Sequence, residues 1–337
     1  MPDPQLISLL LVIFLCLAFN FINGFNDAAS AVATTIGARA MTLPAALTLA
    51  AAGNFIGAFL SHHVAYTVAT VVDPGFISHG LILSALLAAI LWGLGAWSMG
   101  LPSSSSHALI SALAGAAMAK ATDEGATMNV FNWSLLADVI LALFASPLLG
   151  AVAGFLLFRA FARGAAIILP KAPTFGVNRF FARLQLFSAV ATSVSHGVND
   201  AQKTMGLFAL ALFQAGYLER FEIPAWVTAL SAAAIGLGTL LGGVRVLKTV
   251  AKKITDLAPI HGFSAEAGGA VVILGASALG MPVSTTHVVI SSVVGVGTAR
   301  SVRRTPRQIL LAIIWTWLLT VPSTMALAAS IYFMFMA

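Results

Sequence analysis

A short polar motif occurs twice in this chain, and both copies interrupt hydrophobic stretches long enough to enter a membrane. Residues 24–28 read Gly-Phe-Asn-Asp-Ala, and residues 197–201 read Gly-Val-Asn-Asp-Ala. A second motif is duplicated in the same order, as Pro-Ser-Ser-Ser-Ser-His at 102–107 and Pro-Val-Ser-Thr-Thr-His at 282–287. Two unrelated motifs repeated in one order indicate an internal duplication, so the chain is expected to fold as two related halves.

The composition places these halves in a lipid bilayer. Hydrophobic residues make up 59% of the chain and charged residues 8%, and the mean hydropathy is +0.98, far from ordinary soluble usage. The 17 Lys and Arg residues outnumber the 11 Asp and Glu residues, but they lie in short loops between apolar runs. Such loops are typical of cytoplasmic anchoring, so no nucleic-acid partner is expected. The single cysteine, Cys16, excludes an internal disulfide and a cysteine-based metal site.

Hydropathy predicts an all-α integral membrane protein with roughly 10–12 membrane helical segments. Long apolar runs lie near 43–71, 78–99, 133–162, 224–247 and 307–336. Shorter or interrupted runs lie at 5–23 with 26–38, 104–119, 180–196 with 199–217, and 266–280 with 284–299. The first run is not preceded by positive charge, so we interpret it as a retained segment and not as a signal peptide.

Charge in the loops predicts how the chain crosses the membrane. Three basic patches are expected to be cytoplasmic: Arg159, Arg163, Lys171, Arg179 and Arg183; Arg245, Lys248, Lys252 and Lys253; and Arg300, Arg303, Arg304 and Arg307. The other short loops carry acids, which suits the outside. Together with the motif order, this predicts two inverted-topology repeats with broken helices and re-entrant hairpins, and both termini outside. The repeats would span 1–162 and 180–337 as one transport domain, with a cytoplasmic linker at 163–179.

The Ser/Thr motifs are predicted to begin helices, because hydroxyl side chains cap free N–H groups at helix starts. Inside a membrane such helix ends must face protein or a water-filled cavity. Two helix N-termini meeting near the midplane would form a site for a tetrahedral oxyanion. The predicted anion ligands are Ser104, Ser105, Ser106, Ser284, Thr285 and Thr286. The alternative is that these hydroxyls only cap helices or bond neighbouring helices.

The two motif aspartates require a different explanation, because a carboxylate repels an oxyanion and is costly to bury in a membrane. We therefore expect Asp27 and Asp200 to hold a cation or a proton. The neighbouring Asn26 and Asn199 could complete an oxygen shell for sodium, the metal expected only if the protein is sodium-coupled. The alternative is that these Asn-Asp pairs merely satisfy broken backbone.

The halves differ at one charged position. Aligning the motifs places Lys203 where the first half has Ser30, and Lys203 lies within one helical turn of Asp200. The lysine could neutralise Asp200 and stand in for a cation, which would favour proton coupling. It could instead reach the anion, or extend to the membrane surface.

Four other polar residues are further candidates, and of these Glu266 is included with the predicted coupling residues. His107, His196 and His287 adjoin the motifs and could relay protons, although single histidines beside helix caps are more often structural. Glu266 is an embedded acid that could serve coupling or simply sit at a helix N-terminus. No ligand spacing typical of a transition-metal site is present, and no cofactor is expected beyond a co-transported proton or sodium ion.

Taken together, these motifs resemble the PiT family of inorganic phosphate transporters. The resemblance rests on residues 24–29 with Thr34, on residues 195–203, and on residues 282–287, and it spans nearly the whole chain. It implies phosphate uptake coupled to sodium or protons, with Asn-Asp motifs serving the cation and Ser/Thr hairpins the phosphate. Residues 262–266 look like a family acid site that ends at Glu266, whereas Asn54 stands where other members can carry an acid. The Lys203 variant is similar to bacterial members associated with proton coupling or with metal phosphate.

Several alternatives remain at this stage. A sulfate permease of the same fold would bind an anion of the same shape. Retention of both Asn-Asp pairs favours phosphate, because hydrogen phosphate can donate a hydrogen bond to a carboxylate and sulfate cannot. A passive anion channel would carry no uphill flux, and an intramembrane serine hydrolase would need a single nucleophile, not a repeated one.

We expect a secondary active importer that uses alternating access in a bacterial inner membrane. Phosphate or metal phosphate and the bilayer are its predicted partners, and a homodimer is compatible with the sequence.

Overall fold

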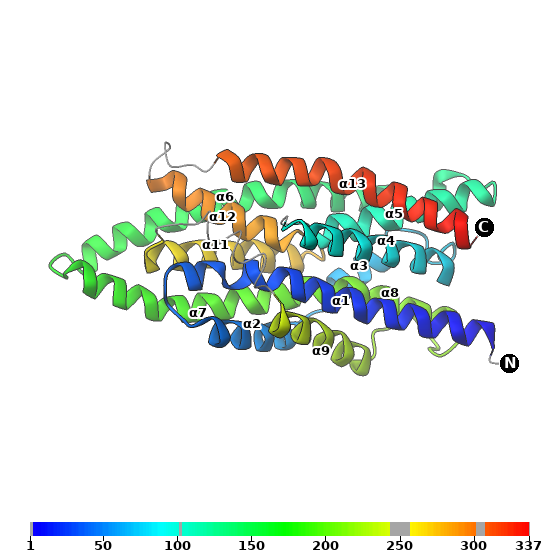
Figure 1. Ribbon diagram of the computed structural model, residues 1–337, viewed down its shortest axis with the longest axis horizontal. Helices are drawn as coiled ribbons and strands as arrows, with labels where there is room; N and C mark the ends of the chain where they lie inside the picture. The colour runs from blue at the N-terminus through cyan, green and yellow to red at the C-terminus, as the bar shows by residue number, and fades with distance from the viewer. Residues whose placement is uncertain (1–2, 101–102, 243–256, 301–306, 337) are drawn as a thin grey trace.

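The computed structural model describes residues 3–100, 103–242, 257–300 and 307–336, and the described part is built from helices (Figure 1). The first half contains α1 (Pro4–Gly37), α2 (Leu43–Gly57), α3 (His63–Thr70), α4 (His79–Ser98), α5 (Ser105–Asp123), the 3-10 helix η1 (Met128–Val130) and α6 (Trp133–Ile168). The second half contains α7 (Thr174–Asp200), α8 (Gln202–Gln214), α9 (Ala225–Leu241), α11 (Pro259–Ala278), α12 (Thr285–Arg300) and α13 (Arg307–Phe335). The all-α fold class is confirmed.

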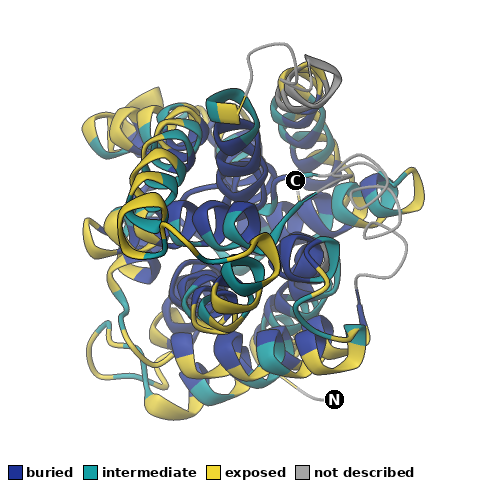
Figure 2. Cartoon of the chain, turned by 90° about the vertical axis from the view of Figure 1, so that its left-hand side faces the viewer, coloured by how far each residue is buried: buried dark blue, intermediate teal, exposed yellow. Residues whose placement is uncertain are grey.

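Several helices are long and apolar enough to cross a membrane. In the described part these are α1, α4, α6 and residues 314–335 of α13, while α2 and α9 are shorter apolar helices. Polar caps set where they begin: the Asp3 carboxylate accepts from the Gln5 N–H at 3.0 Å, and the Ser78 hydroxyl accepts from the Leu81 N–H at 3.3 Å. Seen end on, buried residues line the contacts between helices and exposed residues face outward (Figure 2). This is the pattern of a helix bundle surrounded by lipid.

Each half packs its helices against the other half in a reciprocal way. Helix α1 packs on α9, and α7 packs on α2; likewise α5 packs on α13, and α12 packs on α6. Both α6 and α13 contain an internal proline, Pro147 and Pro322. In this pattern α1 corresponds to α7, α2 to α9, α5 to α12 and α6 to α13, as expected for two repeats. Helices α6 and α7 extend into the predicted linker and leave only residues 169–173 between them, so the domain boundaries at 162 and 180 stay a prediction.

The glycine that opens each Asn-Asp motif lies at one of these reciprocal contacts. A Cβ on Gly24 would lie 2.2 Å from the Ile235 carbonyl oxygen of α9, and a Cβ on Gly197 would lie 2.2 Å from the Asn54 carbonyl oxygen of α2. Small residues allow membrane helices to approach this closely. The repeated glycines therefore have a packing role that places each motif against the opposite half.

We expect Gly197→Ala to destabilise the protein by about 1–3 kcal/mol, because α2 must move away from the added methyl group. Gly275→Ala in α11 is the matched control, since nothing lies within 4 Å of its added Cβ, and it should be neutral or stabilising. Thermal unfolding of both purified variants in detergent measures the difference. Equal melting temperatures for the two variants would contradict the packing role of Gly197.

The structure differs from the sequence expectation at the first Asn-Asp motif. Residues 24–28 do not break a helix, because α1 is continuous from Pro4 to Gly37. The second copy interrupts its helix only at Ala201, whose dihedral angles (φ −64°, ψ −30°) are still helical. The polar side chains find partners on neighbouring helices, so the backbone can keep its own hydrogen bonds. A polar motif in an apolar run does not by itself distinguish these two cases.

The apolar run at 43–71 was also expected to be one span, and the structure divides it into α2 and α3. Helix α3 begins inside the protein. There the Gln202 side-chain oxygen accepts from the N–H groups of Val64 at 3.0 Å and Ala65 at 3.2 Å. Gln202 is fully buried. A side chain that is distant in the sequence therefore accepts from the free N–H groups at the start of α3. The local sequence does not mark this helix start.

The two chain ends lie at the same end of the molecule (Figure 1). The turn between α6 and α7, beside the first basic patch, lies at the opposite end, whereas the acidic loops after α5 and α8 lie at the end with the termini (Figure 1). The second basic patch falls at 243–256, outside the described residues, as do Arg303 and Arg304 of the third. The described loops thus separate by charge along the long axis.

Candidate anion and cation site

The Ser/Thr motifs begin helices α5 and α12, as predicted. The Ser104 hydroxyl accepts from the His107 N–H at 3.2 Å, and the Ser284 hydroxyl accepts from the His287 N–H at 3.4 Å. The two helix starts lie close together, because the ring centroids of His107 and His287 are 5.8 Å apart. Ser104 and Ser284, which occupy matching positions in the two motifs, therefore cap their helices.

The remaining hydroxyls lie on the inner side of these helix starts. The Ser106 hydroxyl donates to the Val283 carbonyl at 2.6 Å and so joins α5 to the segment before α12. Thr285 and Thr286 lie in the first turn of α12 and are buried. Because successive residues of a helix point in different directions, these two threonines reach different partners.

Each threonine donates to the motif aspartate of a different half. The Thr285 hydroxyl donates to Asp200 at 2.8 Å, and the Thr286 hydroxyl donates to Asp27 at 2.6 Å. Both carboxylates are buried, with relative exposures of 1% for Asp200 and 7% for Asp27. One carboxylate oxygen from each aspartate and a ring nitrogen of His196 lie within 4.8 Å of one another. The predicted anion ligands and cation ligands therefore form one cluster and not two separate sites.

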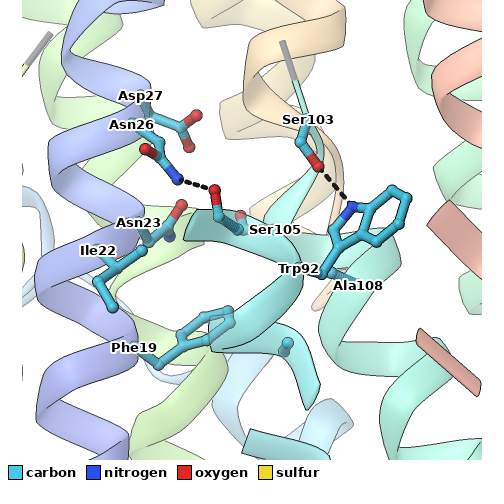
Figure 3. A pocket seen from close by; sticks show the side chains of 11 residues that line it. Phe19, Ile22, Asn23, Asn26, Asp27, Trp92, Ser103, Ser105 and Ala108 are labelled. Atoms are coloured by element: carbon cyan, nitrogen blue, oxygen red, sulfur yellow. Dashed lines mark hydrogen bonds between the residues drawn. The ribbon is translucent and has the colours of Figure 1, made fainter. Parts of the chain in front are cut away.

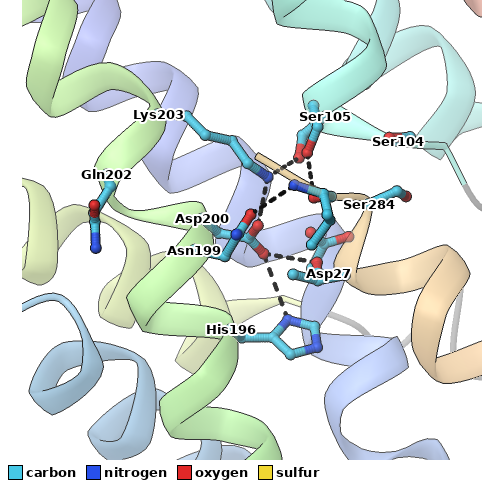
Figure 4. A network of polar contacts seen from close by, with 12 residues as sticks. Asp27, Ser104, Ser105, His196, Asn199, Asp200, Gln202, Lys203 and Ser284 are labelled. Atoms are coloured by element: carbon cyan, nitrogen blue, oxygen red, sulfur yellow. Dashed lines mark hydrogen bonds and ion pairs between the residues drawn. The ribbon is translucent and has the colours of Figure 1, made fainter. Parts of the chain in front are cut away.

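Lys203 supplies a positive charge to this cluster (Figure 4). Its ammonium lies 2.5 Å from an Asp200 carboxylate oxygen and 3.4 Å from the Ser105 hydroxyl of α5. His196 Nδ1 lies 3.5 Å from the other Asp200 oxygen. Lys203 is 1% exposed, so it does not extend to the membrane surface, and that alternative is wrong. The lysine links an acid of the second half to a serine of the first.

The two motif asparagines hold backbone groups of neighbouring segments. The Asn199 amide donates to the Met281 carbonyl at 3.1 Å, and its oxygen accepts from the Val283 N–H at 3.1 Å. Asn199 thereby satisfies the non-helical backbone between α11 and α12. The Asn26 amide donates to the Gly93 carbonyl of α4 at 3.3 Å. The role of either asparagine as a sodium ligand stays a prediction.

A small cavity lies on the first-half side of the cluster (Figure 3). Its polar lining comes from α1 and the start of α5: Asn23, Asn26, Asp27, Ser103 and Ser105. The cavity measures about 20 Å³, which is room for about one water molecule. A tetrahedral oxyanion is larger than this, so binding one here requires the surrounding helices or hydroxyls to move.

Comparison with known proteins identifies the family. Residues 23–328 match the profile of the phosphate transporter family. The chain belongs to this family. It is 41% identical over 335 residues to a probable low-affinity inorganic phosphate transporter of Bacillus subtilis (strain 168), and the match covers 98% of each chain. A protein of the same description from Rhizobium meliloti (strain 1021) is 41% identical over 333 residues, covering 98% of this chain and 96% of the relative.

The fold of this chain is similar to that of a solved structure described as the sodium-dependent phosphate transporter. The two superpose with a TM-score of 0.88 at 27% identity, covering 97% of this chain and 98% of the other. The resemblance to the PiT family noted from the motifs is thus confirmed. The relatives are named as transporters, so the chain is a membrane transporter and not an enzyme, and the serine hydrolase alternative is wrong.

Glu266, the third predicted acid, lies in a different cluster of this family member. Its carboxylate is fully buried and faces α1 and α7 across the bundle. Four side chains donate to its oxygens, at the distances given: Thr34 (2.6 Å), Thr35 (2.7 Å), Gln185 (3.1 Å) and Ser188 (2.5 Å). Thr34 lies about 10 Å along α1 from Asp27, from the rise per residue of a helix. If Glu266 binds a coupling ion, it therefore does so at a site separate from Asp27 and Asp200.

Sequence reasoning missed how His196 combines with the two aspartates. Its spacing to Asp200 of one helical turn was visible in the sequence and places both side chains on one face of α7. The approach of Asp27 from α1 was not visible, because it depends on how the two halves pack. The histidine adds a nitrogen to a set of oxygen ligands and widens the range of cations that the cluster could bind.

Proposed function

We propose that this protein imports inorganic phosphate by symport with a cation, with the proton as the coupling ion. The observation that carries the proposal is the pair of Asp27 and Asp200, each held by a hydroxyl from the first turn of α12. A helix start with hydroxyls suits an oxyanion, and two buried carboxylates suit a cation. Because both sets share one cluster, binding of the cation lowers the negative charge that phosphate meets.

The binding sequence follows from these charges. A proton or cation first binds at the aspartates, phosphate then binds at Ser105, Thr285, Thr286 and the helix starts, and the two halves rock to open the site to the other side. Hydrogen phosphate can donate a hydrogen bond to a carboxylate, whereas sulfate cannot. This favours phosphate over sulfate in a site that retains both aspartates.

We further propose that the protein lies in a bacterial inner membrane with both termini outside. The support is the charge separation along the bundle: the described basic turn lies opposite the termini, and the acidic loops lie beside them (Figure 1). Positive loops remain on the cytoplasmic side during insertion. Labelling of a cysteine introduced at the exposed Asp3 by an impermeant reagent on intact cells tests this orientation.

Transport itself is tested by uptake of radiolabelled phosphate into proteoliposomes that contain the purified protein. An imposed proton gradient should drive accumulation above the external concentration, an imposed sodium gradient should not, and excess sulfate should compete weakly. Accumulation with sodium alone would replace the proton as coupling ion. Equilibration without accumulation under either gradient would instead indicate a passive anion channel, and preferential sulfate flux a sulfate permease.

A further inference from the structure

Lys203 is among the largest fully buried side chains of the described residues. A lysine ammonium inside a membrane protein is costly unless a carboxylate and further acceptors surround it. Here the acceptors are Asp200 at 2.5 Å and the Ser105 hydroxyl at 3.4 Å. The ammonium thus occupies the position beside Asp200 that a small bound cation would occupy.

The matching position in the first half carries no charge. Ser30 aligns with Lys203, and its hydroxyl donates to Thr286 at 3.3 Å, beside Asp27. The motif aspartate of each half therefore accepts from a threonine of α12, Asp27 from Thr286 and Asp200 from Thr285. A lysine accompanies the aspartate only in the second half. Two carboxylates and one ammonium leave the cluster with one uncompensated negative charge when His196 is neutral.

We infer that Lys203 is a tethered cation that permanently takes the place of one mobile cation at Asp200, which leaves Asp27 as the acid for the co-transported ion. This inference rests on the proposed function, since it states which acid the coupling ion uses. The lysine sets ion selectivity in the way a bound metal would, without exchanging with solution.

Removing the lysine should therefore create a sodium site. Lys203→Ser gives the second half the residue that the first half has at the matching position. Asp200 keeps the Thr285 hydroxyl as a partner, and the Ser105 hydroxyl faces the position that the ammonium vacates. Carboxylate and hydroxyl oxygens are the ligands that hard cations prefer. The freed volume of a lysine side chain provides the space for the ion.

The experiment measures the melting temperature of the purified full chain in detergent, in sodium chloride against choline chloride of equal ionic strength. For Lys203→Ser we expect a melting temperature that rises with the logarithm of the sodium concentration, because a ligand that binds only the folded state stabilises it. Wild type and Lys203→Arg should show no difference between the salts. The double variant Asp200→Asn with Lys203→Ser should also show none, since the carboxylate is gone. Lys203→Gln is measured alongside in case Lys203→Ser does not fold.

Transport provides a second readout. Phosphate uptake by Lys203→Ser proteoliposomes should acquire a requirement for sodium, with labelled sodium entering together with phosphate, whereas wild type should take up phosphate without sodium. If Lys203→Ser and Lys203→Gln show no sodium-specific stabilisation while wild type accumulates phosphate, the inference is overturned and the proposed function stands. If sodium stabilises Lys203→Ser but wild type accumulates no phosphate, the cation site is supported and the proposed function fails.

Discussion

Asp27→Asn should abolish the accumulation of phosphate against its gradient. The substitution keeps the size of the side chain and an oxygen that can accept from Thr286, but it removes the charge that binds the coupling ion. We expect initial gradient-driven uptake to fall by at least about tenfold, within the range typical of coupling between two bound ligands. The measurement is uptake of labelled phosphate into proteoliposomes under an imposed proton gradient.

The matched control for this variant is Asp138→Asn. Asp138 is also an acid within a membrane helix, α6, but it is exposed on the outer surface of the bundle. Its replacement should leave accumulation unchanged. The elution volume of Asp27→Asn on size exclusion should match wild type, because no buried partner loses its hydrogen bond. Retained uphill accumulation by Asp27→Asn would show that Asp27 does not carry the coupling ion.

The sequence predicted the parts of the site better than their arrangement. The duplicated motifs and their hydropathy were enough to predict helices that begin near Ser104 and Ser284, because capping is a local property. They were also enough to predict two related halves. The pairing of Thr285 with Asp200 and of Thr286 with Asp27 was not predictable, since it depends on the direction in which α12 enters the bundle.

The same distinction explains the errors in the fold. Gln202 satisfies the start of α3 from a distant helix, so hydropathy alone could not divide the run at 43–71. The motif glycines were assigned no role, although Gly24 and Gly197 mark where α1 meets α9 and α7 meets α2. Local sequence reports which groups need partners, and packing between the halves decides which partners they obtain.

Asp200→Asn should be the most destabilising single change in the cluster. It leaves the Lys203 ammonium buried without a carboxylate, and removing one partner of a buried ion pair costs about 3–5 kcal/mol. Adding Lys203→Met should recover most of this loss, because the pair is then replaced by neutral groups of similar size. Thermal unfolding of the single and double variants in detergent measures both effects.

Asp123→Asn controls for the loss of an acid as such, since Asp123 is exposed at the end of α5, and it should change stability by less than about 0.5 kcal/mol. The double variant separates two roles of the ion pair. One outcome is a stable Asp200→Asn, Lys203→Met protein that accumulates no phosphate. In that case the charges of the pair are not needed to hold α7 against α5 and α12, and the pair serves transport. If the double variant is as unstable as Asp200→Asn alone, the cost does not come from the unpaired ammonium, and the lost acceptor for Thr285 becomes the explanation.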